Sequence, residues 1–156
     1  MDLMGKSAII SGLRPRSAPF LLLIEDSADD RMLAVRALAE GDLSLRVQTA
    51  EDGSDAIRQI ADMDENGYPR MVLLDLNLPD VHGLDVLSSL RQDPALAHVP
   101  IIVFSSSDES EEVEESYLRG ANSFVKKPSS GEHFAHVIRT TARYWLHTNL
   151  GRPDYN

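Results

Sequence analysis

Five reactive side chains in this sequence each stand at the end of a short apolar run. They are Glu25 and Asp26 after Phe20–Ile24, Asp75 after Met71–Leu74, Ser105 after Pro100–Phe104, and Lys127 after a shorter run that ends at Val125. Continuous apolar runs of this length are typical of strands buried on both faces of a parallel sheet. The carboxyl ends of such strands meet at one edge, where open α/β sheets bind ligands. We therefore expect three carboxylates, a hydroxyl and an ammonium group to lie close together.

The negative charge at this predicted edge indicates a bound cation. Two carboxylates about 4 Å apart repel each other by roughly 4 kcal/mol at an effective dielectric constant near 20, and one lysine compensates only part of three negative charges. A hard divalent ion such as Mg²⁺, or Mn²⁺ in its place, accepts oxygen ligands of this kind. We expect Asp26 and Asp75 to be direct metal ligands and the backbone carbonyl of Asn77 to be a third. Glu25 would act through water in the outer shell.

A carboxylate beside a divalent cation, a hydroxyl and a lysine can accept a phosphoryl group. Carboxylates form aspartyl phosphates, which makes Asp75 the predicted nucleophile. The cation neutralises charge on the transferring group, while Lys127 and Ser105 would bind its other oxygens. Each residue also has a plainer interpretation, because Asp26, Ser27 or Ser105 could cap a helix and Lys127 could be a surface charge. Their joint occurrence favours the phosphoryl-acceptor site.

Helical patterns separate the strands and give the chain an alternating order. The expected helices cover Ser27–Glu40, the region of Ala56–Ile60, Leu84–Leu90, Asp108–Arg119 and Ser130–Thr148, and a further strand with alternating apolar residues covers Leu43–Thr49. Strands that alternate with helices in this way predict an α/β fold. Its doubly wound parallel sheet has helices on both faces and right-handed crossovers.

Length, charge and composition exclude several classes of protein. The chain of 156 residues suits one domain, and we expect a flexible leader over residues 1–18, the folded domain over 19–148 and a tail over 149–156. The net charge of −10 argues against nucleic-acid binding, which needs a basic face. No apolar run is long enough to span a bilayer, and the start lacks an export signal. The absence of cysteine fits a cytoplasmic protein.

The motifs together resemble the receiver domain of two-component response regulators. The matching residues are the acidic pair Glu25-Asp26, Asp75 with Asn77 and Pro79, Ser105 with Ser106, and Lys127-Pro128, and the spacings between Asp75, Ser105 and Lys127 also agree. The resemblance implies a flavodoxin-like (βα)5 fold with strand order 2-1-3-4-5, and phosphorylation of Asp75 by a sensor histidine kinase. It also implies a cis bond between Lys127 and Pro128. His82 stands where the family usually has an acid.

The same resemblance implies a switch made by a hydroxyl and an aromatic residue, here Ser105 and Phe124. Phosphoryl oxygens would recruit Ser105 and open a space that Phe124 fills. The faces altered would be those of the Asp108–Arg119 helix, the Asn122–Val125 strand and the last helix. The alternative is that Phe124 is an ordinary core residue.

The last helix carries more apolar and aromatic residues than one buried stripe requires. We predict that Tyr144 and Trp145, near its end, lie in a homodimer interface. In the alternative, these aromatic residues fold back onto their own core. Together with the start Glu25–Asp30, this helix resembles the subgroup of response regulators paired with phytochrome-type kinases. Because the chain ends soon after Thr148, we expect a stand-alone receiver.

Three other functions stay open from the sequence. An Mg²⁺-dependent phosphohydrolase with an aspartyl intermediate usually has a second acid two residues after the nucleophile, where this sequence has Asn77. A receiver used only as a docking module would normally have lost Asp26, Asp75 or Lys127. A flavodoxin-like cofactor binder would need a glycine-rich phosphate loop, which this sequence lacks. We therefore expect a signalling protein rather than an enzyme.

Overall fold

The structure is a computed structural model, which describes residues 19–41, 43, 45–63 and 67–151. Its centre is a parallel sheet in the order β2-β1-β3-β4-β5. The strands are β1 (Phe20–Ile24), β2 (Arg46–Ala50), β3 (Met71–Leu74), β4 (Ile101–Ser105) and β5 (Ser123–Lys126). This arrangement confirms the predicted doubly wound sheet and its strand order. The leader predicted for residues 1–18 lies outside the described residues.

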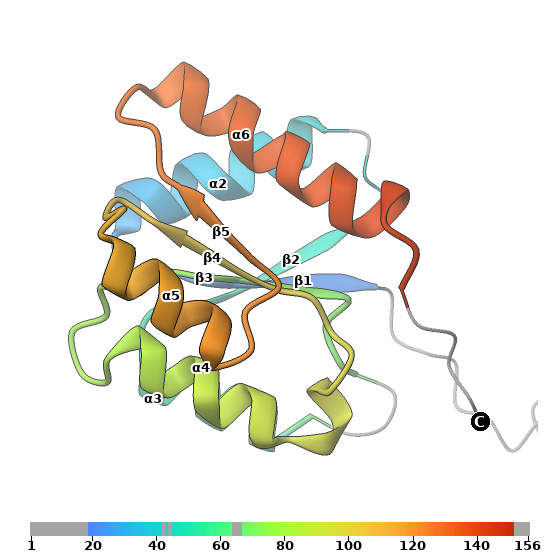
Figure 1. Ribbon diagram of the computed structural model, residues 1–156. Helices are drawn as coiled ribbons and strands as arrows, with labels where there is room; N and C mark the ends of the chain where they lie inside the picture. The colour runs from blue at the N-terminus through green and yellow to red at the C-terminus, as the bar shows by residue number, and fades with distance from the viewer. Residues whose placement is uncertain (1–18, 42, 44, 64–66, 152–156) are drawn as a thin grey trace, which may run out of the picture.

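Helices cover both faces of the sheet (Figure 1). They are α2 (Ala28–Glu40), α3 (Gly53–Ala61), α4 (Gly83–Gln92), the short 3-10 helix η1 (Pro94–Leu96), α5 (Ser110–Leu118), α6 (Gly131–Arg143) and the π-helical turn η2 (Tyr144–Thr148). Figure 1 shows α2 and α6 on one face and α3, α4 and α5 on the other. Two hydrophobic clusters fill the spaces between the sheet and these two layers.

The three central strands are buried because their side chains alternate between the two clusters. In β3, Val72 and Leu74 pack into the cluster on the α3–α5 side, and Met71 and Leu73 pack into the cluster on the α2–α6 side. All residues of β1, β3 and β4 are buried. The residues that follow these strands therefore start from fixed backbone positions.

The two adjacent lysines at the end of the outer strand β5 point in opposite directions. Successive side chains of a strand point to opposite faces, so Lys126 is exposed and forms an ion pair with Asp108 at 2.8 Å, while Lys127 points into the molecule. The backbone N–H of Lys127 donates to the carbonyl of Ser105 at 2.7 Å and continues the pairing of β5 with β4. The family-based expectation of a cis bond before Pro128 was wrong, because no peptide bond in the described residues is cis. Strand alternation suffices to aim Lys127 inward.

The start of α4 depends on a glycine. A Cβ atom on Gly83 would lie 2.4 Å from the Cα of Leu76 and 2.8 Å from the carbonyl oxygen of Asp75. Only glycine permits this close approach between the helix start and the loop after β3. His82 caps the helix, since its Nδ1 accepts the N–H of Leu84 at 3.1 Å. The departure from the family's usual acid thus preserves a capping group.

The structure changes the predicted start of α5 and the predicted end of the last helix. The helix expected from Asp108 begins at Ser110, with Glu109 as its N-cap residue. The last helix ends as an α-helix at Arg143 and continues as the π-helical turn of η2. The apolar pattern of a sequence indicates which side of a helix is buried. It does not indicate where the helical hydrogen bonding changes from α to π.

Candidate functional site

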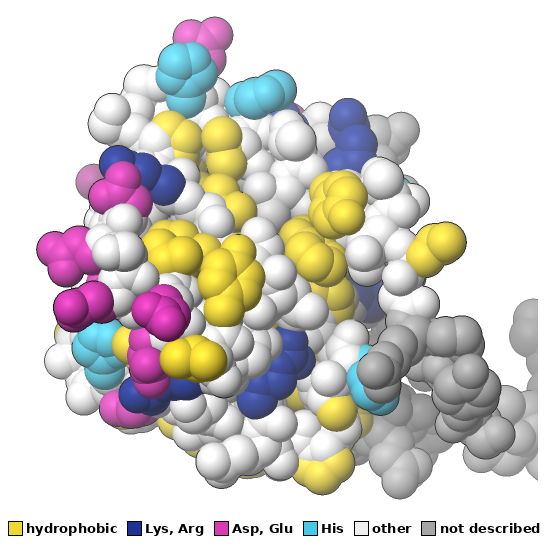
Figure 2. Space-filling model, in the orientation of Figure 1, with side chains coloured by type: hydrophobic (Ala, Val, Ile, Leu, Met, Phe, Trp, Pro, Cys, Tyr) yellow, Lys and Arg dark blue, Asp and Glu magenta, His cyan; other side chains and the backbone are white. Residues whose placement is uncertain are grey.

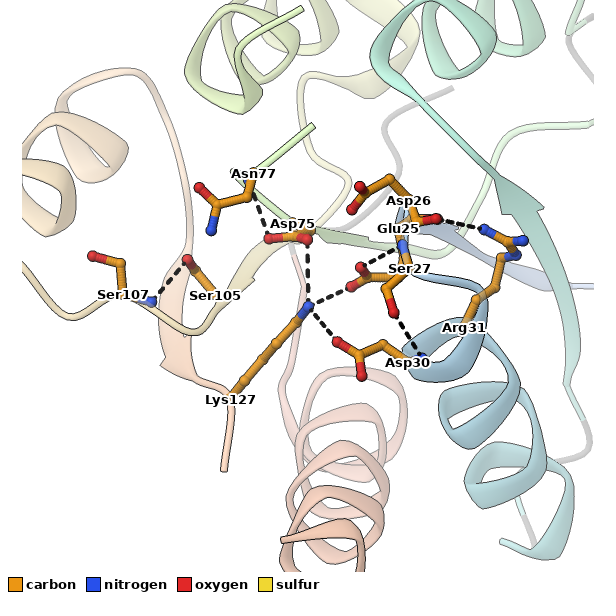
Figure 3. A network of polar contacts seen from close by, with 10 residues as sticks. All are labelled: Glu25, Asp26, Ser27, Asp30, Arg31, Asp75, Asn77, Ser105, Ser107 and Lys127. Carbon is orange, nitrogen blue, oxygen red and sulfur yellow. Dashed lines mark hydrogen bonds and ion pairs between the residues drawn. The ribbon is translucent and has the colours of Figure 1, made fainter. Parts of the chain in front are cut away.

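The predicted site residues meet at the carboxyl edge of the sheet (Figure 3). Glu25 follows β1, Asp75 follows β3, Ser105 ends β4 and Lys127 follows β5. Glu25, Asp75 and Ser105 are 2%, 5% and 0% exposed, whereas Asp26 is exposed. Figure 3 shows the side chains of Lys127 and Asp75 pointing toward one another, with Ser105 on one side and the acidic pair on the other.

Three carboxylates form a potential metal site. Glu25, Asp26 and Asp75 each offer an oxygen atom, and these atoms all lie within 4.8 Å of one another. Hard divalent cations such as Mg²⁺ and Mn²⁺ prefer oxygen ligands, and they offset the repulsion between such groups. The donor set therefore fits the predicted cation.

Asp75 has a partner for each carboxylate oxygen. Its Oδ1 accepts the backbone N–H of Asn77 at 3.2 Å, and its Oδ2 lies 3.3 Å from Nζ of Lys127. The residue follows a strand that is buried throughout. The carboxylate is thus held at the edge of the sheet while it remains next to the acidic pair.

Lys127 binds three carboxylates with one ammonium group. Its Nζ lies 2.6 Å from Glu25 Oε2, 3.1 Å from Asp30 Oδ2 and 3.3 Å from Asp75 Oδ2. Its side chain is 8% exposed. Burial alone would lower the pKa of Lys127, but the hydrogen bond to Glu25 and the charges of Asp75 and Glu25 outweigh burial and raise it. Lys127 is therefore charged at neutral pH.

Glu25 lies deeper than the other acids. Burial raises its pKa to about 7, the hydrogen bond from Lys127 opposes that shift, and the charge of Asp75 adds to it. Its Oε1 accepts the backbone N–H of Ser27 at 3.2 Å. Both carboxylate oxygens thus have partners inside the protein.

Ser105 does not cap a helix, because α5 begins only at Ser110. Its Oγ accepts the backbone N–H of Ser107 at 3.3 Å, which leaves the hydroxyl hydrogen to be donated elsewhere. Asp26 is not a cap either. Ser27 caps α2, since its Oγ accepts the N–H of Asp30 at 3.2 Å.

The site predicted from the sequence did not include two residues of this network, Asp30 and Arg31 of α2. Nη1 of Arg31 donates to the backbone carbonyl of Glu25 at 2.9 Å and to that of Asp26 at 3.4 Å, so it fixes the backbone of the acidic pair. Side chains in a first helical turn point back toward the helix start. That rule, applied to a helix whose N-cap is Ser27, places both residues beside the site.

Phe124 of β5 lies on a face formed by α5, β5 and α6, called here the α5-β5-α6 face. The other predicted switch residue, Ser105, is buried in β4, and the predicted interface residues Tyr144 and Trp145 lie in η2. Phe124 is partly buried against the cluster on the α3–α5 side, and its N–H donates to the hydroxyl of Tyr117 at 3.2 Å. Figure 2 shows acidic side chains gathered over α5, beside an apolar area over β5.

The two aromatic residues of η2 differ in exposure. Tyr144 and Trp145 pack edge to face, with ring centroids 5.2 Å apart. Trp145 is partly buried against the cluster on the α2–α6 side, while Tyr144 is 48% exposed. Trp145 thus contacts its own core, and Tyr144 is the residue that is left available to a partner.

Comparison with known proteins identifies the family. Residues 21–139 match the response regulator receiver domain. The chain belongs to this family. FilR2 of Methanothrix harundinacea, a probable methanogenesis regulatory protein, is 34% identical to this receiver over 134 residues, which cover 84% of the receiver and 86% of FilR2. Response regulator Rcp1 of Synechocystis is 28% identical over 131 residues, which cover 82% of the receiver and 89% of Rcp1.

Solved structures of response regulators resemble this receiver closely. The phosphorylated cyanobacterial phytochrome response regulator RcpA superimposes with a TM-score of 0.80 at 28% identity, over 88% of this chain and 100% of RcpA. The Mn²⁺-bound form of response regulator Rcp1 gives a TM-score of 0.78 at 27% identity, over 86% of this chain and 99% of Rcp1. In the part of the receiver that the structure describes, no helix has both the length and the apolar character to cross a membrane.

Proposed function

We propose that this receiver accepts a phosphoryl group on Asp75 from the phosphohistidine of a sensor histidine kinase, in a Mg²⁺-dependent reaction. One observation carries the proposal: a buried strand end holds the Asp75 carboxylate 3.3 Å from the Lys127 ammonium and within a cluster of three carboxylates. An isolated surface acid has neither the cation nor the ammonium group that phosphoryl transfer requires.

The proposed reaction is a displacement at phosphorus. A carboxylate oxygen of Asp75 forms a bond to the phosphorus atom, and the bond from phosphorus to the imidazole nitrogen of the kinase breaks. The imidazole leaves with the bonding electron pair and gains a proton from solvent. Lys127 and the hydroxyl of Ser105 would donate hydrogen bonds to the phosphoryl oxygens and stabilise their charge.

Asp26, Asp75 and the backbone carbonyl of Asn77 would hold Mg²⁺, or Mn²⁺ in its place, with Glu25 in the outer shell. The bound ion would supply positive charge to the phosphoryl oxygens. Arg31 supports this arrangement, because it holds the backbone carbonyls of Glu25 and Asp26. The protein would thereby assist its own phosphorylation and dephosphorylation, without turnover of an external phosphate ester.

We propose that phosphorylation of Asp75 changes the conformation of the α5-β5-α6 face. Ser105 would turn toward the phosphoryl group, and Phe124 would fill the space that this movement opens. The partly buried position of Phe124 supports this role, since it touches the core and also borders the surface.

The proposed upstream partner is a phytochrome-type histidine kinase. RcpA is a cyanobacterial phytochrome response regulator, and its fold and sequence resemble this receiver. We further propose a cytoplasmic protein with a leader over residues 1–18, a receiver over 19–148 and a tail over 149–156. It would form a homodimer through the region of Tyr144 and Trp145.

Incubation with acetyl phosphate and Mg²⁺, followed by intact mass measurement, tests the central proposal. We expect one added phosphoryl group in the unmutated protein, and none in Asp75→Asn or after metal chelation. Asp29→Asn, which removes an exposed acid of α2, is the matched control and should retain the added mass. The absence of a mass shift in the unmutated protein would overturn the proposal.

A further inference from the structure

The ammonium group of Lys127 has no hydrogen-bond donor to spare. A lysine carries three N–H donors, and three carboxylate oxygens, from Glu25, Asp30 and Asp75, lie within 3.3 Å of Nζ. A phosphoryl oxygen that arrives at Asp75 needs one of these donors. One of the three present partners must therefore give up its hydrogen bond.

The three partners are not equally fixed. Glu25 has a side chain that is 3% exposed, the shortest contact with Lys127, and a second oxygen that accepts the N–H of Ser27. Asp75 is the phosphoryl acceptor itself and is anchored by the N–H of Asn77. Asp30 belongs to the first turn of α2, its side chain is 34% exposed, and among the described residues its carboxylate has a polar contact with Lys127 alone.

Solvent lies next to the weakest of these partners. Asp30 and Lys127 line an open cleft together with Ser106, Pro128, Ser129 and His133. Figure 3 shows the Asp30 side chain reaching Lys127 from α2, on the side of Lys127 away from Ser105. A displaced Asp30 carboxylate can thus turn into water without entering the core.

We propose that Asp30 is a positioning residue that holds the third N–H of Lys127 before phosphorylation and cedes it to the phosphoryl group. The inference rests on the proposed phosphorylation of Asp75. Asp30 then has two effects on the site. It keeps Lys127 oriented toward the acids while the site is unphosphorylated, and it competes with the phosphoryl oxygens for the same donor.

Asp30→Asn removes the charge that competes for Lys127 and keeps the shape of the side chain. We expect this variant to bind beryllofluoride, a phosphoryl analogue, about three- to fivefold more tightly in the presence of Mg²⁺, as the loss of one partly exposed ion pair implies. Mg²⁺ affinity in the absence of beryllofluoride should change by less than about twofold, because Asp30 is not among the three clustered carboxylates. A general loss of structure would weaken both affinities and cannot produce this split.

Asp29→Asn is the matched control, because it removes the same charge from the neighbouring, exposed position of the same helical turn. Its beryllofluoride affinity should equal that of the unmutated protein. An equal increase in beryllofluoride affinity in both variants, or no increase in Asp30→Asn, would overturn the proposed exchange of Lys127 hydrogen bonds between Asp30 and the phosphoryl group. The proposed phosphoacceptor function would then still stand. Absence of beryllofluoride binding by the unmutated protein would instead overturn the proposed function, and the exchange with it.

Discussion

Lys127 cannot by itself neutralise the carboxylates around it. Glu25, Asp30 and Asp75 contact its ammonium group, and Asp26 adds a further acid to the cluster. A protein that gathers like charges in this way loses stability unless a cation joins them. Because protonation of a carboxylate relieves this repulsion, the stability of the metal-free protein should depend on pH.

Glu25 determines the sign of that dependence. Its pKa in the folded protein is raised by burial to about 7 from the ordinary value of 4.5, so between these values the folded state binds more protons than the unfolded state. Stability then falls as the pH rises. We expect the melting temperature of the metal-free protein, measured relative to Glu25→Gln, to fall between about pH 5 and pH 7.

Saturating Mg²⁺ provides the control for this experiment. The ion binds the folded state, raises the melting temperature by mass action, and favours the charged form of Glu25. The fall relative to Glu25→Gln should then become smaller. If the melting temperatures of the metal-free unmutated protein and of Glu25→Gln changed with pH in parallel, this would contradict the role assigned to buried Glu25.

Helices and strands could be predicted to different degrees. The buried strands β1, β3 and β4 were evident because all their side chains are apolar up to the reactive residue. The boundaries of β2 and α5 were less accurate, since a partly exposed strand and an acidic helix start have weaker apolar patterns. The close approach of Gly83 to Leu76 is a tertiary contact that sequence spacing does not encode.

Gly83→Ala should destabilise the protein markedly. The added Cβ would lie 2.4 Å from the Cα of Leu76, so α4 or the loop that carries Asn77 must move. We expect the free energy of unfolding, measured by urea denaturation, to fall by about 1–3 kcal/mol or more. Gly131→Ala is the control, because no described atom lies within 4 Å of its Cβ position. Its effect should stay within about 0.5 kcal/mol, and equal losses in both variants would contradict the steric argument.

The site was more predictable than the network that supports it. Asp75, Ser105 and Lys127 could be placed together because strand ends of a parallel sheet share one edge. Asp30 and Arg31 could not be placed in the same way, since their positions depend on where α2 begins and on how it leans over that edge. The resemblance to the family pointed to Lys127 rather than Lys126. In the structure strand alternation turns Lys127 inward, and the expected cis bond at Pro128 does not occur.

The molecule as a whole has two separate surfaces for its proposed partners. The acidic site opens at the carboxyl edge of the sheet, while Tyr144 lies at the far end of α6 and is 48% exposed. A dimer that forms through Tyr144 would therefore leave the phosphoacceptor site accessible to a kinase. Trp145 would contribute less to such an interface than we predicted from the sequence, because part of it packs on its own core.

Light scattering at tens of micromolar protein tests this arrangement. We expect a dimer for the unmutated protein and a shift toward monomer for Tyr144→Ala, because removal of an aromatic anchor at an interface typically costs more than about 1 kcal/mol. Leu118→Ala is the control, since Leu118 is an exposed residue of α5 on the opposite layer of the molecule. A monomeric unmutated protein, with and without beryllofluoride, would refute the interface, and dissociation by Leu118→Ala would move it to α5.

The pairing of the strands gives the sheet an uneven stiffness. β1 and β3, which carry the acids, each have a hydrogen-bonded neighbour on both sides, whereas β5, which carries Lys127, is bonded to β4 alone. Displacement of β5 therefore disturbs one ladder of hydrogen bonds, and displacement of β3 would disturb two. The acids thus follow strands in the more constrained middle of the sheet, whereas Lys127, which we propose binds a phosphoryl oxygen, follows an edge strand that is easier to displace.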